Sequence, residues 1–296
     1  MTDGASTLRR LFARAGVIRL IGAHNALGAR MAARSGFDGV WASSFELSAS
    51  QAVPDTGIIT LNEHLEVVRA MCRSVEVPVV VDCDTGYGDS LQFAHAVRQF
   101  EAAGVAAVCV EDKRFPKINS FAPGRQELAS IEEFVAKLHA GKQAQRSPDF
   151  CIIARVEALI AGEGRVEALR RAHAYADAGA DAILIHSKSP TVDELAEVVL
   201  SWNRPVPLVA VPTSYYQTTA EQLAALGIKM VIYANQGLRC ALKAMEQVYA
   251  EILRSGSTAL IEERLWSMDA IFELQSDLWV KHMASNVVVQ GAGSES

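Results

Sequence analysis

The sequence predicts an α/β fold, a (β/α)8 TIM-type barrel with extra C-terminal helices. Eight short apolar runs alternate along the chain with amphipathic segments that have helical spacing. The apolar runs are continuously apolar rather than alternating, which is typical of parallel strands covered on both faces. Several helical segments end in a glycine just before the next apolar run, so the chain repeats one helix–glycine–strand unit.

Each apolar run is assigned to one strand of the barrel. The expected strands are Arg19–Ala23, Gly39–Ser43, Val77–Asp82, Ala106–Glu111, Cys151–Arg155, Ala182–His186, Leu208–Val211 and Met230–Tyr233. A doubly wound open sheet is the alternative. It is disfavoured because no GxGxxG motif follows the first strand.

The helical segments between the strands follow an apolar period close to 3.6 residues. Clear examples are Leu61–Ser74, Ser90–Ala103, Ile131–Gly141 and Gly164–Ala178. We expect the glycines that precede strands to adopt the left-handed conformation that ends a helix. These glycines are Gly36, Gly104, Gly179 and Gly227.

We expect one domain over residues 1–296, with two helices at about 238–285 beyond the eighth strand. These helices are predicted at Leu238–Ser255 and Ile261–Met283. A barrel needs only one helix at this point, so the second must bury its apolar face elsewhere. We therefore predict a homo-oligomer in which these helices contact another subunit.

Composition narrows the class of partner. Half of the residues are hydrophobic, and the net charge of -6 comes without any basic block. Nucleic acid and an anionic membrane are thus not expected as partners, whereas a small-molecule substrate is. The five cysteines are odd in number and lack CxxC spacing, which predicts free thiols and, with no signal-peptide pattern, a cytoplasmic protein.

Acidic residues stand where two neighbouring strands end. Asp82 and Asp84 close one apolar run, and Glu111 closes the next. Because parallel strands end at the same rim of a barrel, these acids and Asp55 predict an oxygen-rich site for Mg2+, with Mn2+ as an alternative. The competing interpretation is that these acids cap helices or form salt bridges in loops. For Asp112, which follows Glu111, the metal-site and the structural interpretation both remain open.

Two further strand ends carry basic side chains. Arg155 lies within an apolar run and needs an anionic partner, either a neighbouring glutamate or a substrate phosphate or carboxylate. His186 follows four apolar residues and is expected at the site, with a hydrogen-bonded core histidine as the alternative. The polar segment Arg114–Leu128 is too rich in Pro and Gly for regular structure, and we expect a lid that brings Lys117 and Asn119 to the ligand. A solvated loop without such a role is the alternative.

Six ordered motifs resemble the isocitrate lyase/phosphoenolpyruvate mutase superfamily over about residues 10 to 280. They are WASSFELSAS, DCDTGYGD, EDKRFPKINS, FCIIARVEALIAG, DAILIHSK and VPLVAVPT. The resemblance implies a Mg2+-dependent barrel that acts on α-oxo or enol carboxylates. It also implies a homotetramer or homodimer with a terminal helix swapped between subunits.

The resemblance also implies roles for individual residues. Asp82 matches the direct metal ligand, and Asp55, Asp84 and Glu111 match acids that hold the metal's waters. Trp41, Ser43, Ser44 and Phe45 match the segment that binds the substrate carboxylate, with Ser44 in place of the family's glycine. The groups that match the surroundings of a phosphoryl group are Lys117, Asn119, Ser120, Arg155 and His186.

Within the superfamily the lid separates the activities. The lyases carry a cysteine in a KKCGH-type motif, and the segment from Lys117 to Ser120 has none. The resemblance therefore implies the branch that acts on phosphonopyruvate. Asn119 favours the mutase, an isomerase that interconverts phosphoenolpyruvate and phosphonopyruvate in phosphonate biosynthesis; the alternatives are phosphonopyruvate hydrolase and, less favoured, a carboxylate C–C lyase.

Overall fold

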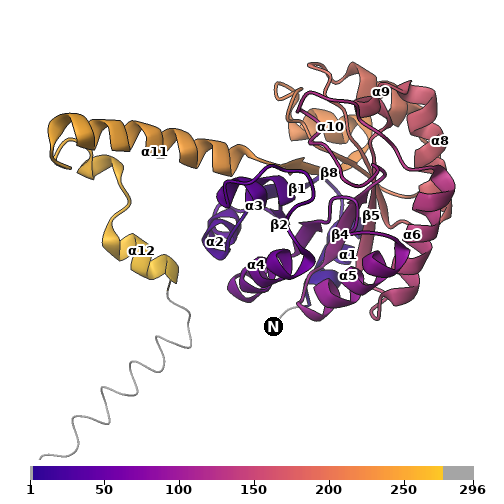
Figure 1. Cartoon of the computed structure of the whole chain (residues 1–296), viewed down its shortest axis with the longest axis horizontal. Coiled ribbons are helices and arrows are strands. Elements are labelled where there is room, and N and C mark those ends of the chain that lie inside the picture. Colours follow the sequence, from indigo (N-terminus) through magenta and orange to yellow (C-terminus); the bar gives the residue numbers. More distant parts are fainter. Residues whose placement is uncertain (1–2, 276–296) are drawn as a thin grey trace, which may run out of the picture. The chain divides into compact units, whose positions relative to one another are not determined.

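Eight parallel strands form a closed barrel in the computed structural model of the chain, which describes residues 3–275 (Figure 1). Each strand pairs with its neighbours in sequence, and β8 pairs with β1 through Met230 and Ile18. The predicted (β/α)8 fold is confirmed. The strands are β1 Ile18–Ala23, β2 Gly39–Ala42, β3 Val79–Asp82, β4 Ala107–Glu111, β5 Cys151–Val156, β6 Ala182–Ile185, β7 Leu208–Ala210 and β8 Ile228–Tyr233.

The described residues also form α-helices before, between and after the strands. They are α1 Gly4–Ala13, α2 Ala26–Arg34, α3 Ser44–Ser50, α4 Leu61–Ser74, α5 Ser90–Ala102, α6 Ile131–Ala144, α7 Ala158–Ala161, α8 Gly164–Asp177, α9 Asp193–Leu200, α10 Ala220–Leu226, α11 Gln236–Ser255 and α12 Met268–Gln275. Capping boxes fix the starts of α4, α5 and α10 at Thr60, Asp89 and Thr219. The four glycines expected to end helices all have positive φ, between 85° and 114°.

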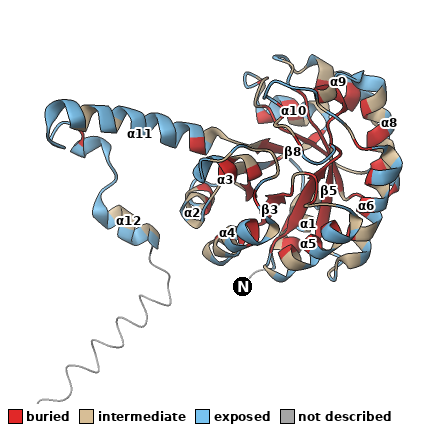
Figure 2. Ribbon diagram, viewed as in Figure 1, coloured by how far each residue is buried: buried red, intermediate tan, exposed pale blue. Residues whose placement is uncertain are grey.

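Side chains alternate between two hydrophobic cores because successive strand residues point to opposite faces. In β3, Val80 faces the barrel interior, while Val79 and Val81 pack against the surrounding helices. The strands are buried throughout most of their length (Figure 2). This burial on both faces is the reason that the strand sequences are continuously apolar.

The N-terminal helix closes one end of the barrel. Leu8 of α1 is fully buried in the interior core, and Leu11 and Phe12 pack against it. Gly4 lies close to Pro78 and Ala106, which precede β3 and β4. With that end covered, the carboxyl ends of the strands are the open end available for a site.

Two short helices and the C-terminal region differ from the sequence prediction. α3 and α7 begin directly after β2 and β5, and their lengths of seven and four residues are too short to give a periodic pattern. The helix predicted at Ile261–Met283 begins only at Met268, after a 3-10 turn at Glu262–Arg264. Its part beyond Gln275 lies outside the described residues.

Internal contacts divide the chain into one unit that runs through Cys240 and another that begins at Ala241. In the second unit Ile261 is fully buried, but Tyr249, Trp266 and Phe272 are about half exposed. Exposed apolar side chains of this size usually mark a contact surface. The predicted contact with another subunit, and with it the oligomer, remains a prediction. None of the described helices combines the length and hydropathy needed to span a membrane.

We expect Gly22→Ala to destabilise the protein strongly. A Cβ at Gly22 of β1 would lie 2.3 Å from the backbone carbonyl oxygen of Ala234, so the strand would have to move. Overpacking of this kind costs about 1–3 kcal/mol in the free energy of unfolding. Gly237→Ala is the control, because a Cβ there fits at 3.4 Å and alanine favours the helix. Equal urea midpoints for the two variants would contradict this account.

Candidate active site

A cavity of about 260 Å³ opens at the carboxyl ends of the strands. Side chains from most strand ends and from the segment 114–128 line it. They are Trp41, Ser43, Phe45, Asp55, Asp82, Glu111, Lys113, Lys117, Asn119, Ser120, Phe121, Arg155, His186, Val211, Thr213, Ala234, Asn235 and Arg239. Of the site residues predicted from sequence, only Ser44 and Asp84 are absent from this lining, and both contact residues that belong to it.

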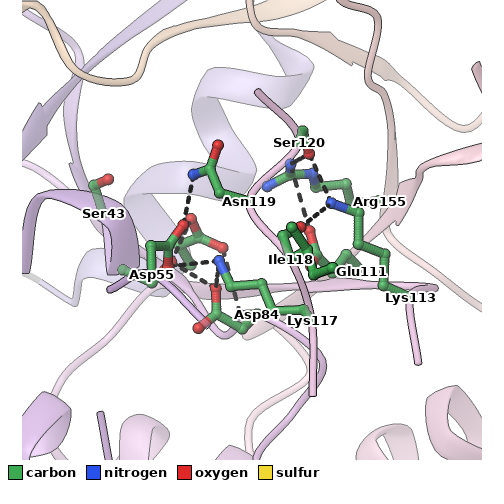
Figure 3. A network of polar contacts seen from close by, with 12 residues as sticks. Ser43, Asp55, Asp84, Glu111, Lys113, Lys117, Ile118, Asn119, Ser120 and Arg155 are labelled. Atoms are coloured by element: carbon green, nitrogen blue, oxygen red, sulfur yellow. Dashed lines mark hydrogen bonds and ion pairs between the residues drawn. The ribbon is translucent and has the colours of Figure 1, made fainter. Parts of the chain in front are cut away.

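Four carboxylates act on one ammonium group, that of Lys117, in the acidic half of the cavity. Lys117 Nζ lies 2.6 Å from Asp55 Oδ1 and 2.7 Å from Asp84 Oδ1 (Figure 3). Asp82 and Glu111 also act on Lys117 electrostatically. Although burial alone would lower the pKa of Lys117, these carboxylates raise it, so the group stays charged.

The glycine loop after β3 explains how Asp84 comes to face these groups. Asp84 itself has a φ of 49°, and Tyr87 has a φ of 64°. Non-glycine residues adopt this conformation only where their surroundings impose it. Here the buried Lys137 donates to the Thr85 carbonyl at 2.6 Å, and the Tyr87 hydroxyl lies 2.8 Å from His64 Nδ1.

Asp82 is the most perturbed acid of the cluster. Burial and the neighbouring Asp84 carboxylate together raise its pKa to about 7, against the opposing effect of Arg155 and Lys117. Ser44 Oγ lies 3.0 Å from Asp82 Oδ2 and 2.6 Å from Asp84 Oδ1, so its single proton serves one acid at a time. The cluster carries more negative charge than its protein partners neutralise.

Arg155 and His186 form the basic half of the cavity together with a buried glutamate, Glu157. Arg155 Nε donates to Glu157 Oε1, and His186 Nδ1 lies 2.7 Å from the same oxygen. Arg155 Nη2 also lies 2.8 Å from His186 Nδ1, so that nitrogen faces two partners. No residue in the range 3–275 forms a hydrogen bond with His186 Nε2, which leaves it available to a ligand.

The segment 114–128, called the lid below, folds over this cavity. Lys113 and Leu128 form an isolated bridge at its base. Asn119 Nδ2 donates to Asp55 Oδ2 at 2.6 Å, and Asn119 Oδ1 accepts from the Phe121 backbone at 2.9 Å. The lid thus places Lys117 and Asn119 against the acids of the cavity, and their contact with a ligand remains a prediction.

The acidic half fits a hard divalent cation that keeps part of its water. Glu111 Oε1 is buried and has no hydrogen-bond partner, and Asp82 is buried next to a second carboxylate. Across residues 3–275, no three His, Cys, Asp or Glu side chains already converge as a complete metal cage. An incomplete set of protein ligands suits Mg2+, which proteins usually hold through one or two carboxylates and several waters.

Local sequence patterns do not reveal the places of three further residues. Glu157, the glutamate that neighbours Arg155, contacts both the barrel and the lid. Arg239 of α11 lines the cavity mouth from beyond the last strand, where no strand-end signal exists. Asp112 instead points away, because its carboxylate accepts from Tyr175 and Arg171 inside the helical layer. Asp112 therefore has a structural role, as a salt-bridge partner of Arg171, and does not line the cavity.

The sequence profile described as phosphoenolpyruvate phosphomutase matches residues 8–253. The chain belongs to this family. Phosphonopyruvate hydrolase of Variovorax sp. (strain Pal2) is 49% identical over 257 residues, which cover 86% of this chain and 89% of the hydrolase.

Solved structures of the family have the same fold. Phosphoenolpyruvate phosphomutase from Streptomyces platensis subsp. rosaceus is 52% identical, with a TM-score of 0.93, over 96% of this chain and 98% of that chain. A phosphonopyruvate hydrolase in complex with oxalate and Mg2+ is 44% identical, with a TM-score of 0.90, over 96% and 99%. The family and fold are thus established, and the choice between the two activities rests on the site.

We expect Asp82→Asn to raise the melting temperature at pH 8 when a chelator is present. The folded protein holds the Asp82 proton up to about pH 7, whereas the unfolded chain releases it near its ordinary value of 3.8. The folded state binds more protons between these values, so the stability of the wild type falls as the pH rises through this window. The melting temperatures of the two proteins should converge below pH 4. A variant less stable than the wild type at pH 8 would contradict the burial argument.

Proposed function

We propose that the protein is a phosphoenolpyruvate mutase that interconverts phosphoenolpyruvate and 3-phosphonopyruvate. The observation that carries the proposal is Asn119, whose side-chain amide is held by Asp55 at the cavity wall. Asparagine at this place in the lid is similar to the mutase signature. The lid also lacks the cysteine that the C–C lyases use, which argues against a carboxylate lyase.

The two halves of the cavity suit the two ends of the substrate. Arg155 and His186 present donors for the three oxygens of a phosphoryl group, which carry the charge of a loose transition state. Trp41, Ser43 and Phe45 form the wall assigned to the carboxylate end. Asp82, Asp84 and Glu111 would hold Mg2+ and its waters, and Mg2+ would supply positive charge beside the substrate's carboxylate and enolate oxygens.

Transfer between the enol oxygen and the methylene carbon requires that the phosphoryl group stays in place while the three-carbon unit turns. Arg155, His186 and Lys113 surround the basic half of the cavity, where such a group would be held. Water is the competing nucleophile, so the site must be dry at that moment. Lys117 and Ser120 of the lid are buried over the cavity, which serves this purpose.

Phosphonopyruvate hydrolase is the second candidate, favoured by the 49% identity to the Variovorax enzyme. The same site would hydrolyse phosphonopyruvate if one water reached the phosphorus. Phosphorus NMR of the protein with Mg2+ and phosphonopyruvate distinguishes the two. A phosphoenolpyruvate signal without free phosphate is the result we expect, whereas phosphate and pyruvate in equal amounts would establish the hydrolase.

We expect Asn119→Ala to lower turnover by about two orders of magnitude or more, because a donor at the transferring group is lost. The variant should still fold, since Asn119 sits in the lid and not in the barrel core. Gln145→Ala is the control, because Gln145 lies in a loop at the far end of α6. Turnover is followed by phosphorus NMR and folding by circular dichroism; wild-type turnover in Asn119→Ala would contradict the assignment.

A further inference from the structure

Glu157 is a fully buried carboxylate that meets four donors from different parts of the chain. Oxygen Oε1 faces the barrel, where Arg155 Nε donates to it and His186 Nδ1 lies at 2.7 Å. Oxygen Oε2 faces the lid, where Ser120 Oγ donates at 2.9 Å and Lys113 Nζ lies at 3.2 Å. One carboxylate therefore divides its two oxygens between the basic half of the cavity and the lid.

The lid side of this arrangement exists only when the lid is in place. Ser120 Oγ accepts from Lys113 Nζ at 2.7 Å while it donates to Glu157, and Lys113 Nζ also donates to the Ile118 carbonyl at 3.0 Å. Arg155 Nη2 reaches the same hydroxyl at 3.3 Å. Lifting Ser120 would thus take a donor from Glu157 and partners from Lys113 at the same time.

A second contact joins the lid to the same cluster. The ring of Phe121 meets the ring of His186 edge to face, with centroids 6.1 Å apart. His186 is buried and bonded to Glu157, so the lid touches both members of that pair. The position of the lid and the orientation of the imidazole are therefore fixed together.

The backbone of Glu157 is anchored independently. Its N–H donates to Asp112 Oδ1 at 2.8 Å, and Asp112 Oδ2 accepts from Tyr175 at 2.7 Å and from Arg171 at 2.9 Å. Arg171 also donates to the carbonyl of Ala129, the residue that follows the lid. These hydrogen bonds hold the backbone of Glu157 in place, so that its carboxylate keeps its position when the lid closes.

We propose that Glu157 is a positioning residue that couples closure of the lid, through Ser120, to the alignment of Arg155 and His186. The proposal rests on the function proposed above, because it assigns Arg155 and His186 to the phosphoryl group. With the lid closed, Glu157 holds both side chains in the geometry that receives the group. With Ser120 withdrawn, Glu157 Oε2 loses one donor and keeps Lys113, which has itself lost its contact with Ser120, so the carboxylate can turn and the alignment is lost.

The test compares Glu157→Gln, Ser120→Ala and the double variant with Glu163→Gln, a control in an exposed loop. Amide hydrogen exchange in residues 117–122 is measured on the protein without substrate. We expect Glu157→Gln and Ser120→Ala each to raise exchange about tenfold, since each removes a charged hydrogen bond. The double variant should exchange no faster than the faster single variant, because both substitutions remove the same Ser120–Glu157 hydrogen bond.

Kinetics supply the second readout. We expect kcat to fall about 100-fold in Glu157→Gln and about tenfold in Ser120→Ala, while KM for phosphonopyruvate changes less than about threefold. In the double variant kcat should equal that of Glu157→Gln. A loss in KM alone, or effects that multiply in the double variant, would overturn the coupling.

The two proposals fail separately. If the wild type leaves phosphonopyruvate unchanged, the mutase and the hydrolase both fail, yet lid exchange still reports whether Glu157 holds Ser120. If Glu157→Gln does not fold, as judged by circular dichroism, Ser120→Ala carries the test alone. Wild-type lid exchange in Ser120→Ala would then refute the link.

Discussion

Buried charge must be compensated, and this requirement organises the carboxyl end of the barrel. Eight apolar strands leave little water there, so each ionised side chain needs a partner of opposite charge. Lys117 meets Asp55 and Asp84, and Arg155 meets Glu157. The acidic and basic halves of the cavity arise because these pairs are separated in space. Arg155 Nη2 also reaches Glu111 Oε2 of the acidic half, at a longer distance of 3.4 Å.

This separation determines what the cavity can hold. A ligand with anionic groups at both ends meets Arg155 and His186 at one end and, at the other, acids that suit a cation. Asp82 shows this conflict most clearly. Burial and the Asp84 carboxylate raise its pKa to about 7, whereas the proposed metal ion would bind its charged form. Such a conflict is common at functional sites, where stability is sacrificed for a charge held in place.

Much of this arrangement could be predicted from the sequence, because strand periodicity and strand-end chemistry are local signals. The eight apolar runs gave the strands to within a few residues, and the acids that follow them indicated the site. Glu157 and Arg239 were harder to place. The role of Glu157 depends on a lid serine 37 positions earlier, and Arg239 enters the cavity from a helix.

The orientation of Asp112 depended equally on distant residues. Tyr175 and Arg171, from α8, take its carboxylate into the helical layer, and no spacing near Asp112 reveals this. The helix predicted from Ile261 was wrong in its first part for a related reason, since apolar spacing there also suits a turn that buries Ile261. Patterns of hydrophobicity locate elements well, but long-range hydrogen bonds decide how side chains turn.

The short bridge between Lys113 and Leu128 has a consequence for how such enzymes diversify. Because the two ends of the lid already lie side by side, joined also by the Arg114–Glu127 backbone hydrogen bond of 2.9 Å, the lid is a nearly closed loop. Changing its length or sequence adds little loop-closure entropy and leaves the barrel register untouched. The sequence of the lid can therefore change, in evolution or by design, and alter the reaction that the site catalyses while the barrel stays the same.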